Sequence, residues 1–323
     1  MTLASSFPKA CCVARNTPSH ILVEQNFSSS AKELRRVFDS RFADPRNTQA
    51  ERFVWDYWHV PDQYTAIRTP AYNYFDQKLY LKFHKELVLW GRRTLGCWDI
   101  SPPWMSCYVE GCKQELHSDV PHGPWAFVFS LTPPKNNRSA PSFSGGETLI
   151  LKPEVLNYWQ NFSLAKDREQ MSFVDKIQSI FNQLTVFDPR YPHGVTEVRG
   201  THDPSKGRLV IHGWFTEPKT YLEGPLKTKY RGVEKALNQG FEQVVDLMNA
   251  NPHLQGTMSL QLKVTESGKV QTSRFATCNL LDERGLRPLP VVGQLTSIYK
   301  KLQFPTVKAG SGATLVTIPL IVS

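Results

Sequence analysis

Three residues of the sequence have the types and spacing to hold one metal ion. His117 and Asp119 lie two apart in ELHSDV, and His193 follows later in FDPRYPHGV. Side chains two apart on a strand project from the same face, so a β run starting here predicts that the first two point to one side. Two imidazoles and a carboxylate leave three positions of an octahedral ion open, as oxygen activation by non-haem Fe(II) requires, whereas zinc prefers a tetrahedral site. We therefore predict an iron site formed by His117, Asp119 and His193.

An arginine beyond the last histidine could hold an anion beside that metal. Arg208 begins the apolar strand GRLVIHGWF, fifteen residues after His193. A planar, permanently charged guanidinium in such a strand suits bidentate binding of a carboxylate. Arg199, at the edge of a turn, and Arg190 are rival anchors. We favour Arg208 because an alternating apolar strand follows it.

The order H-x-D, H and R carries a family resemblance. From Trp104 to Phe215 the chain resembles the Fe(II)- and 2-oxoglutarate-dependent dioxygenases, close to their prolyl-hydroxylase-like and PKHD-type branches. The tyrosine in CYVEG and the GGE turn before TLILK agree with this resemblance. One departure is that the family's arginine usually lies about ten residues beyond the distal histidine, so THDPSK indicates a longer hairpin here.

The resemblance implies roles for these residues and a reaction. Arg208 would bind the C5 carboxylate of 2-oxoglutarate, and Tyr108 would hydrogen-bond the same group. The implied cofactors are Fe(II), 2-oxoglutarate as co-substrate and O₂, with ascorbate as a further candidate. The implied reaction hydroxylates an unactivated C–H bond of a peptide, a protein side chain or an amino acid, and releases succinate and CO₂.

The elements that must position these residues change type along the chain. Helices are predicted over 31–43 and 76–95, where apolar residues recur every three or four positions, after an irregular segment over 1–28. Short alternating runs separated by Gly, Pro and Asn follow from about 104 to 217, which predicts an all-β barrel. The resemblance specifies a double-stranded β-helix (jelly-roll), so the fold class is α+β. The segment 152–182 is predicted as inserted helix and loop that helps to form the substrate wall.

A second unit is predicted after a break at Pro218, Gly224 and Pro225. The predicted domains are therefore 1–225, which carries the oxygenase, and 226–323, a small α+β domain. The second domain's elements are expected to be a helix at 231–248, strands at 257–265 and 269–279, a helix at 291–302 and a strand at 313–322. It resembles the TonB-like C-terminal domain of some motility and energy-transducing proteins, which implies a protein partner for residues 226–323.

Composition excludes several classes of protein. The net charge is +9, of which residues 226–323 carry +6, but no continuous basic run occurs there, so no nucleic-acid partner is expected. No run of eighteen apolar residues predicts a membrane span, and the first residues lack the apolar core of a secretory signal, so a cytoplasmic location is expected. The cysteines form no C-x-x-C pair and are expected to be reduced thiols: Cys11, Cys12, Cys97, Cys107, Cys112 and Cys278.

Two alternative functions stay open from the residues alone. The chain could be a non-catalytic binding protein on a degenerate barrel, or a cupin-like zinc hydrolase that uses the same two histidines and acid. Of the other histidines, His212 is expected inside the barrel, while His122 and His202 would line the substrate mouth or be solvated. Trp214 could touch the cofactor pocket, but packing in the core is the favoured interpretation.

Overall fold

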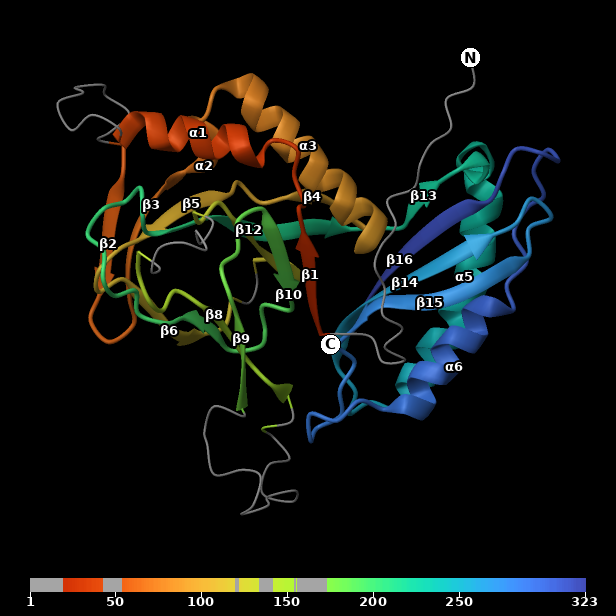
Figure 1. Ribbon diagram of the computed structural model, residues 1–323. Helices are drawn as coiled ribbons and strands as arrows, with labels where there is room; N and C mark the ends of the chain where they lie inside the picture. Colours follow the sequence, from red (N-terminus) through yellow and green to blue (C-terminus); the bar gives the residue numbers. More distant parts are fainter. Residues whose placement is uncertain (1–19, 43–53, 120–121, 134–141, 154, 156–172) are drawn as a thin grey trace.

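The computed structural model describes residues 20–42, 54–119, 122–133, 142–153, 155 and 173–323. Most strands belong to one antiparallel 12-stranded sheet with the order β1-β10-β7-β12-β5-β3-β6-β11-β8-β9, in which β2 also pairs with β3 and β4 with β12. Its strands are β1 (Ile21–Gln25), β2 (Asp56–Val60), β3 (Tyr64–Pro70), β4 (Cys97–Ile100), β5 (Trp104–Tyr108), β6 (Lys113–His117), β7 (Trp125–Ser130), β8 (Thr148–Leu151), β9 (Val174–Ile177), β10 (Gln183–Phe187), β11 (His193–Val195) and β12 (Arg208–Pro218). Figure 1 shows this sheet curled on itself, which confirms the predicted jelly-roll core.

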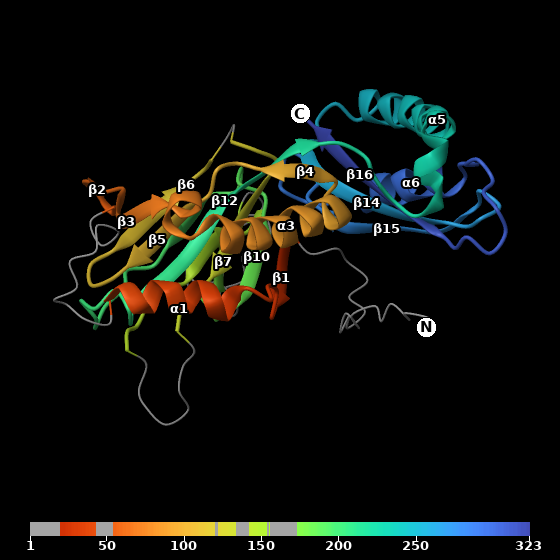
Figure 2. The ribbon, with the colours of Figure 1, turned by 90° about the horizontal axis from the view of Figure 1, so that it is seen from above.

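The N-terminal helices are α1 (Ala31–Phe42), α2 (Ala71–Tyr74) and α3 (Gln77–Thr94). Asp76 caps α3, because its side chain accepts a hydrogen bond from the Leu79 amide. The helix buries Leu79, Phe83 and Leu87 in one hydrophobic cluster with the inner residues of β7 and β12. Helices α1 and α3 lie side by side over this part of the sheet (Figure 2). The predicted helices at 31–43 and 76–95 are therefore confirmed.

Three predictions about segments that flank the barrel strands were wrong. Strand β1 lies inside the segment predicted to be irregular, and the β2–β3 hairpin lies in a predicted loop. Both depend on partners that local sequence does not show, since β1 pairs with β10 and β3 pairs with β5. Strand β9 lies at the end of a segment predicted as helix and loop, and pairs with β8. Residues 154 and 156–172 of that segment fall outside the described residues.

The C-terminal residues form a second, four-stranded sheet with its own hydrophobic cluster. Its order is β13-β16-β14-β15, and the observed elements lie close to the predicted ones. They are β13 (Tyr221–Glu223), η4 (Pro225–Lys229), α5 (Tyr230–Asn249), β14 (Gly256–Val264), β15 (Val270–Cys278), α6 (Leu289–Lys300) and β16 (Thr314–Val322). Strand β13 precedes the predicted boundary at 225 and pairs with β16, so part of this sheet comes from the first predicted domain. The domain division and the TonB-like resemblance stay predictions.

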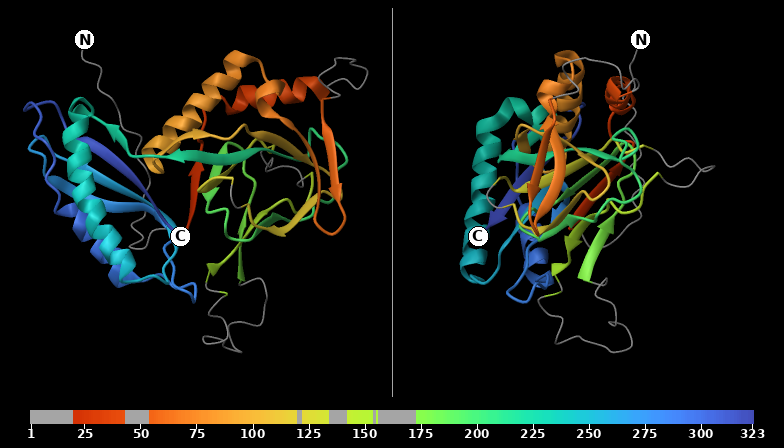
Figure 3. Two further views of the ribbon diagram at one scale, coloured as in Figure 1. Left: turned by 180° about the vertical axis from the view of Figure 1, so that it is seen from behind. Right: turned by 90° about the vertical axis from the view of Figure 1, so that its left-hand side faces the viewer.

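The second sheet packs its two faces against different elements. Met258, Leu260 and Leu262 of β14 point into the cluster formed with α5 and α6. The alternate residues point to the C-terminal end of α3, where the Ser259 hydroxyl donates to the Thr94 carbonyl (2.6 Å) and the Gln261 amide donates to the Arg93 carbonyl (2.8 Å). The last carbonyls of a helix lack partners within it, and here the second sheet supplies hydrogen-bond donors to two of them. Figure 3 shows the end of α3 beside this sheet.

Two further observations bear on the predictions from composition. No helix within the described ranges is long and apolar enough to cross a membrane. The described cysteines are free and buried, as predicted: Cys97, Cys107, Cys112 and Cys278. Cys11 and Cys12 fall outside the described residues.

Candidate metal centre

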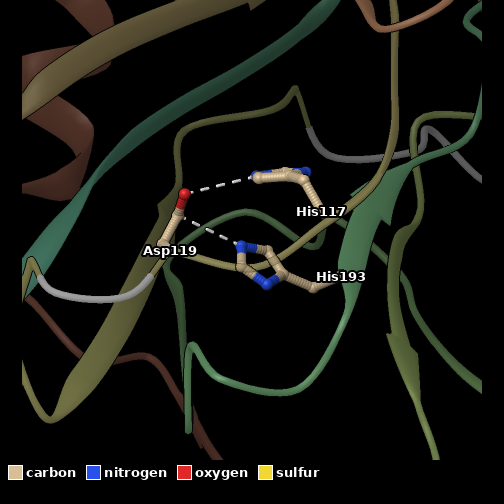
Figure 4. Close-up of side chains that lie close together, drawn as sticks. All are labelled: His117, Asp119 and His193. Atoms are coloured by element: carbon tan, nitrogen blue, oxygen red, sulfur yellow. Dashed lines mark hydrogen bonds and ion pairs between the residues drawn. The ribbon is translucent and has the colours of Figure 1, made fainter.

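His117, Asp119 and His193 converge at one point inside the curled sheet (Figure 4). Their ligand atoms all lie within 4.8 Å of one another. His193 Nε2 is 3.2 Å from one carboxylate oxygen of Asp119, and His117 Nε2 is 3.6 Å from the other. The sheet causes this convergence, because His117 ends β6, His193 begins β11, and the two are direct partners across these antiparallel strands. Paired residues share a face of the sheet, so both rings project to the same side.

Asp119 reaches the same point by a route that differs from the prediction. It was expected on the same strand as His117, but β6 ends at His117 and Asp119 lies two residues beyond it. Its backbone amide donates to the Pro189 carbonyl (3.0 Å) instead of to a neighbouring strand. The loop before β11 therefore draws this carboxylate toward His193.

The hydrogen bonds of the two histidines fix which ring nitrogen faces Asp119. Nδ1 of His117 lies 2.9 Å from the Glu115 carbonyl, and Nδ1 of His193 lies 2.9 Å from the Tyr191 carbonyl. A carbonyl can only accept, so each Nδ1 carries a proton and each Nε2 is the nitrogen turned toward Asp119. Without a metal, His193 Nε2 contacts the Asp119 carboxylate (3.2 Å) and His117 Nε2 contacts the Gln114 amide (3.1 Å); a cation bound between the three groups would replace these contacts. Such backbone contacts to the remote nitrogen are typical of histidines that bind metals.

Charge and burial set the protonation states of His117 and Asp119. Burial lowers the pKa of His117, which keeps its ring neutral. Burial alone would raise the pKa of Asp119, but its contact with His193 and the nearby His117 bring that pKa below its ordinary value. These two groups can then act as ligands at neutral pH without first losing a proton.

Arg208 is almost fully buried, at 1% exposure, and begins β12 as predicted. One terminal nitrogen donates to the Thr148 hydroxyl (3.1 Å), and the guanidinium lies 4.6 Å from the centre of the Tyr108 ring. Its Nε and Nη1 have no hydrogen-bond partner among the described residues. A buried guanidinium whose one printed hydrogen-bond partner is a neutral hydroxyl is costly, and an anion in the same place would offset that cost.

The glycine pair of the GGE turn lets the chain pass close to Arg208. Both Gly145 and Gly146 have positive φ angles, of 77° and 75°. A Cβ at Gly146 would lie 3.1 Å from Arg208 Cδ, and one at Gly145 would lie 1.8 Å from the Glu197 carbonyl oxygen. Only glycine fits these two positions.

The two rival arginines, Arg199 and Arg190, do not line the cavity that Arg208 and the three candidate ligands line. Arg199 is exposed and pairs with Glu197 (2.9 Å). Arg190 pairs with the fully buried carboxylate of Asp188 (2.5 Å). Each already has a carboxylate partner, which leaves Arg208 as the better anchor of the three.

Arg208, Tyr108 and the three candidate ligands line a single cavity of about 580 Å³. Tyr108 is 3% exposed, and burial raises the pKa of its hydroxyl, so it stays protonated as a hydrogen-bond donor. Its predicted bond to a co-substrate stays a prediction. His122 stacks on Trp214 at the cavity wall, with ring centres 4.5 Å apart, whereas His202 is exposed and does not line this cavity.

The loop before β11 is a positioning element that the sequence did not reveal. Arg190 donates to both oxygens of Asp188 and also to the Thr257 hydroxyl of β14 (2.8 Å). The residues on either side of Arg190 supply the Pro189 and Tyr191 carbonyls that contact Asp119 and His193. The second sheet therefore contacts the segment that sets the geometry of the candidate site. The one signal in the sequence is the spacing of two between an aspartate and an arginine.

His212 lies inside the barrel, as predicted, with its Nε2 2.8 Å from the Ser106 hydroxyl. Burial and the charges of Arg208 and Arg68 lower its pKa to about 4. An ordinary histidine titrates near pH 6.5, so between these values the unfolded chain takes up a proton that the folded chain does not. The stability of the protein should therefore fall as the pH drops from 6.5 toward 4.

Replacing His212 by glutamine is expected to reduce that loss by up to about 2 kcal/mol between pH 7 and pH 5. Urea unfolding at the two pH values measures it, with His202→Gln as the exposed control. An identical pH dependence in His212→Gln and the wild type would show that His212 titrates normally.

Comparisons with known proteins give distant likenesses. No family model matches the chain, and no curated protein matches it. A prolyl-4-hydroxylase from Pseudomonas putida is 15% identical over 61% of this chain and 92% of its own, with a TM-score of 0.37. A prolyl hydroxylase from Trichoplax adhaerens, solved with a hypoxia inducible factor peptide, is 17% identical over 61% and 83%, with a TM-score of 0.36. HygX from Streptomyces hygroscopicus, solved with nickel and 2-oxoglutarate, is 13% identical over 61% and 82%, with a TM-score of 0.39.

Proposed function

We propose that this chain is an Fe(II)- and 2-oxoglutarate-dependent oxygenase. The observation that carries the proposal is the joint presence, in one cavity, of a ligand set built for a cation and a buried guanidinium built for an anion. A co-substrate that binds the metal at one end and ends in a carboxylate at the other would satisfy both. 2-Oxoglutarate has this structure.

Each residue has a defined role in this proposal. His117, Asp119 and His193 would hold Fe(II), and three coordination positions would stay open. Arg208 would bind the C5 carboxylate of 2-oxoglutarate, with the Thr148 hydroxyl holding the guanidinium in place. The bound iron and co-substrate would supply the oxidation, in which 2-oxoglutarate yields succinate and CO₂ and one oxygen atom enters a C–H bond of the substrate.

The substrate would be a peptide, a protein side chain or an amino acid. The cavity is larger than 2-oxoglutarate requires, so room is left for part of such a molecule beside the metal. Ascorbate as a further cofactor, a cytoplasmic location and a protein partner for residues 226–323 stay predictions.

The structure offers a reason to prefer this function over the two alternatives. A zinc hydrolase on the same ligands would have no use for a second buried cation without a counter-ion. A degenerate binding protein would have no need to hold both Nδ1 atoms against backbone carbonyls and turn both Nε2 atoms toward one carboxylate.

Anaerobic addition of Fe(II) and 2-oxoglutarate tests the proposal. We expect a weak visible absorption band in the wild type and none in His117→Ala, with succinate formed once oxygen and substrate are supplied. His202→Ala is the matched control, because that histidine is exposed and lies away from the cavity lining. Purified protein that contains zinc and forms no succinate would favour the hydrolase.

A further inference from the structure

The cavity holds a second guanidinium, that of Arg68 on β3, to which the proposed function gives no role. It lies between two indole rings, 3.6 Å from the centre of Trp58 and 4.3 Å from the centre of Trp104. Aromatic rings on both sides fix the plane of a guanidinium and leave only its edge of N–H donors for a ligand. Its Nε is buried without a hydrogen-bond partner in the described part of the chain. Asp56, its cross-strand partner on β2, is exposed; burial lowers the pKa of Arg68 and the charge of Asp56 opposes this shift, but among the described residues no ion pair joins the two side chains.

Strand pairing directs Arg68 toward the candidate metal centre. Arg68 is paired with Ser106 on β5, and Ser106 is paired with Val210 on β12. Directly paired residues share a face of a sheet, as do residues two apart on one strand. Arg68 therefore projects from the same face as Arg208 and His212.

Arg68 also lies where two cavities adjoin. It lines the cavity that holds the candidate ligands and a neighbouring one of about 380 Å³. His117 and Asp119 line both as well. A molecule that enters from the neighbouring cavity would therefore meet the guanidinium beside the metal centre.

The charges of the main cavity do not balance without a further anion. Its charged side chains are Arg68, Arg208 and Asp119, which together carry one positive charge. A divalent metal ion would add two positive charges, and 2-oxoglutarate would add two negative ones. One positive charge remains, and Arg208 would already be neutralised by the co-substrate. The unmatched charge belongs to Arg68.

We propose that Arg68 binds a carboxylate of the substrate, so that the substrate is an organic acid. This inference rests on the proposed function of the same cavity. A planar guanidinium stacked between two indole rings can donate two parallel hydrogen bonds to the two oxygens of a carboxylate. One carboxylate would balance the remaining positive charge. Tyr72, Trp104 and Trp214 line the same cavity, so the body of the substrate next to its carboxylate would be apolar.

Matched acids and amides test this inference. Protein loaded without oxygen with Fe(II) and saturating 2-oxoglutarate is titrated calorimetrically with N-acetyl proline, N-acetyl leucine and N-acetyl phenylalanine, and with their primary amides. Each pair differs only in the charge at one end. We expect at least one acid to bind about 10-fold or more tightly than its amide, as for a hydrogen-bonded charge.

The substitution Arg68→Gln should remove this preference, while the affinity for 2-oxoglutarate and the visible band stay unchanged. Arg199→Gln, outside the cavity, should keep the preference. Circular dichroism and the melting temperature establish that Arg68→Gln is folded.

Several outcomes would overturn the inference. It is wrong if no acid binds, if acids and amides bind equally, or if the preference survives in Arg68→Gln. It is also wrong if Arg68→Gln loses 2-oxoglutarate binding, because Arg68 would then anchor the co-substrate. If the band never forms in the wild type but the preference for acids persists in unloaded protein, the oxygenase proposal fails and the carboxylate site stands.

Discussion

Replacing Arg208 by methionine is expected to weaken 2-oxoglutarate binding by two orders of magnitude or more, about 3 kcal/mol. Methionine keeps much of the length of the side chain and removes its charge, so the carboxylate of the co-substrate would enter the cavity without a partner. The unliganded protein should lose little stability, because Nε and Nη1 of Arg208 are unpaired in it. Calorimetric titration and urea unfolding measure the two effects.

Arg199→Met is the matched control for this substitution, because Arg199 is the rival anchor and is exposed. Its 2-oxoglutarate affinity should equal that of the wild type. Metal affinity should be unchanged in both variants. If Arg208→Met binds 2-oxoglutarate as tightly as the wild type, another group anchors the co-substrate.

Replacing Asp119 by asparagine is expected to remove metal binding at only a small cost to the stability of the metal-free fold. In the wild type, a metal at 100 times its dissociation constant would raise the free energy of unfolding by about 2.7 kcal/mol. The variant should gain none at the same concentration, since the one anionic ligand is lost. In the absence of metal, the variant loses the contact of the carboxylate with His193 Nε2 (3.2 Å), but an amide of the same size can still hydrogen-bond that ring.

Urea unfolding with and without Fe(II), under anaerobic conditions, tests this expectation. Asp246→Asn is the control, because Asp246 is an exposed carboxylate on α5. Equal stabilisation of Asp119→Asn and the wild type by Fe(II) would remove Asp119 from the ligand set. A large loss of stability in the metal-free variant would mean that Asp119 is needed for folding rather than for the metal.

Much of the architecture was predictable because it follows from local periodicity. Leu79, Phe83 and Leu87 recur at helical spacing and lie on the buried face of α3. Strand alternation and turn residues marked the barrel strands in the same way. The convergence of His117 with His193 could also be expected, because each residue adjoins a recognisable strand.

The features that were missed depend on contacts between distant segments. Asp119 leaves β6 because its amide bonds to Pro189, which is far away in the sequence. The orientation of the Arg68 guanidinium depends on its contacts with the indole rings of Trp58 and Trp104, which lie on two other strands. No local sequence pattern around Arg68 predicts these contacts. Strand β1 (ILVEQ) has a short apolar run that does not alternate, and its one buried residue is Ile21, so the strand depends on its pairing with β10.

The contacts of β14 with α3 and with Arg190 have a consequence for any shortened form of this protein. A chain that stopped near residue 225 would leave the Arg93 and Thr94 carbonyls without the donors they now have. It would also free Arg190 from Thr257, next to the loop that holds Asp119 and His193. The C-terminal residues therefore support the barrel next to the candidate metal centre, and we expect a chain shortened in this way to hold Asp119 and His193 less firmly.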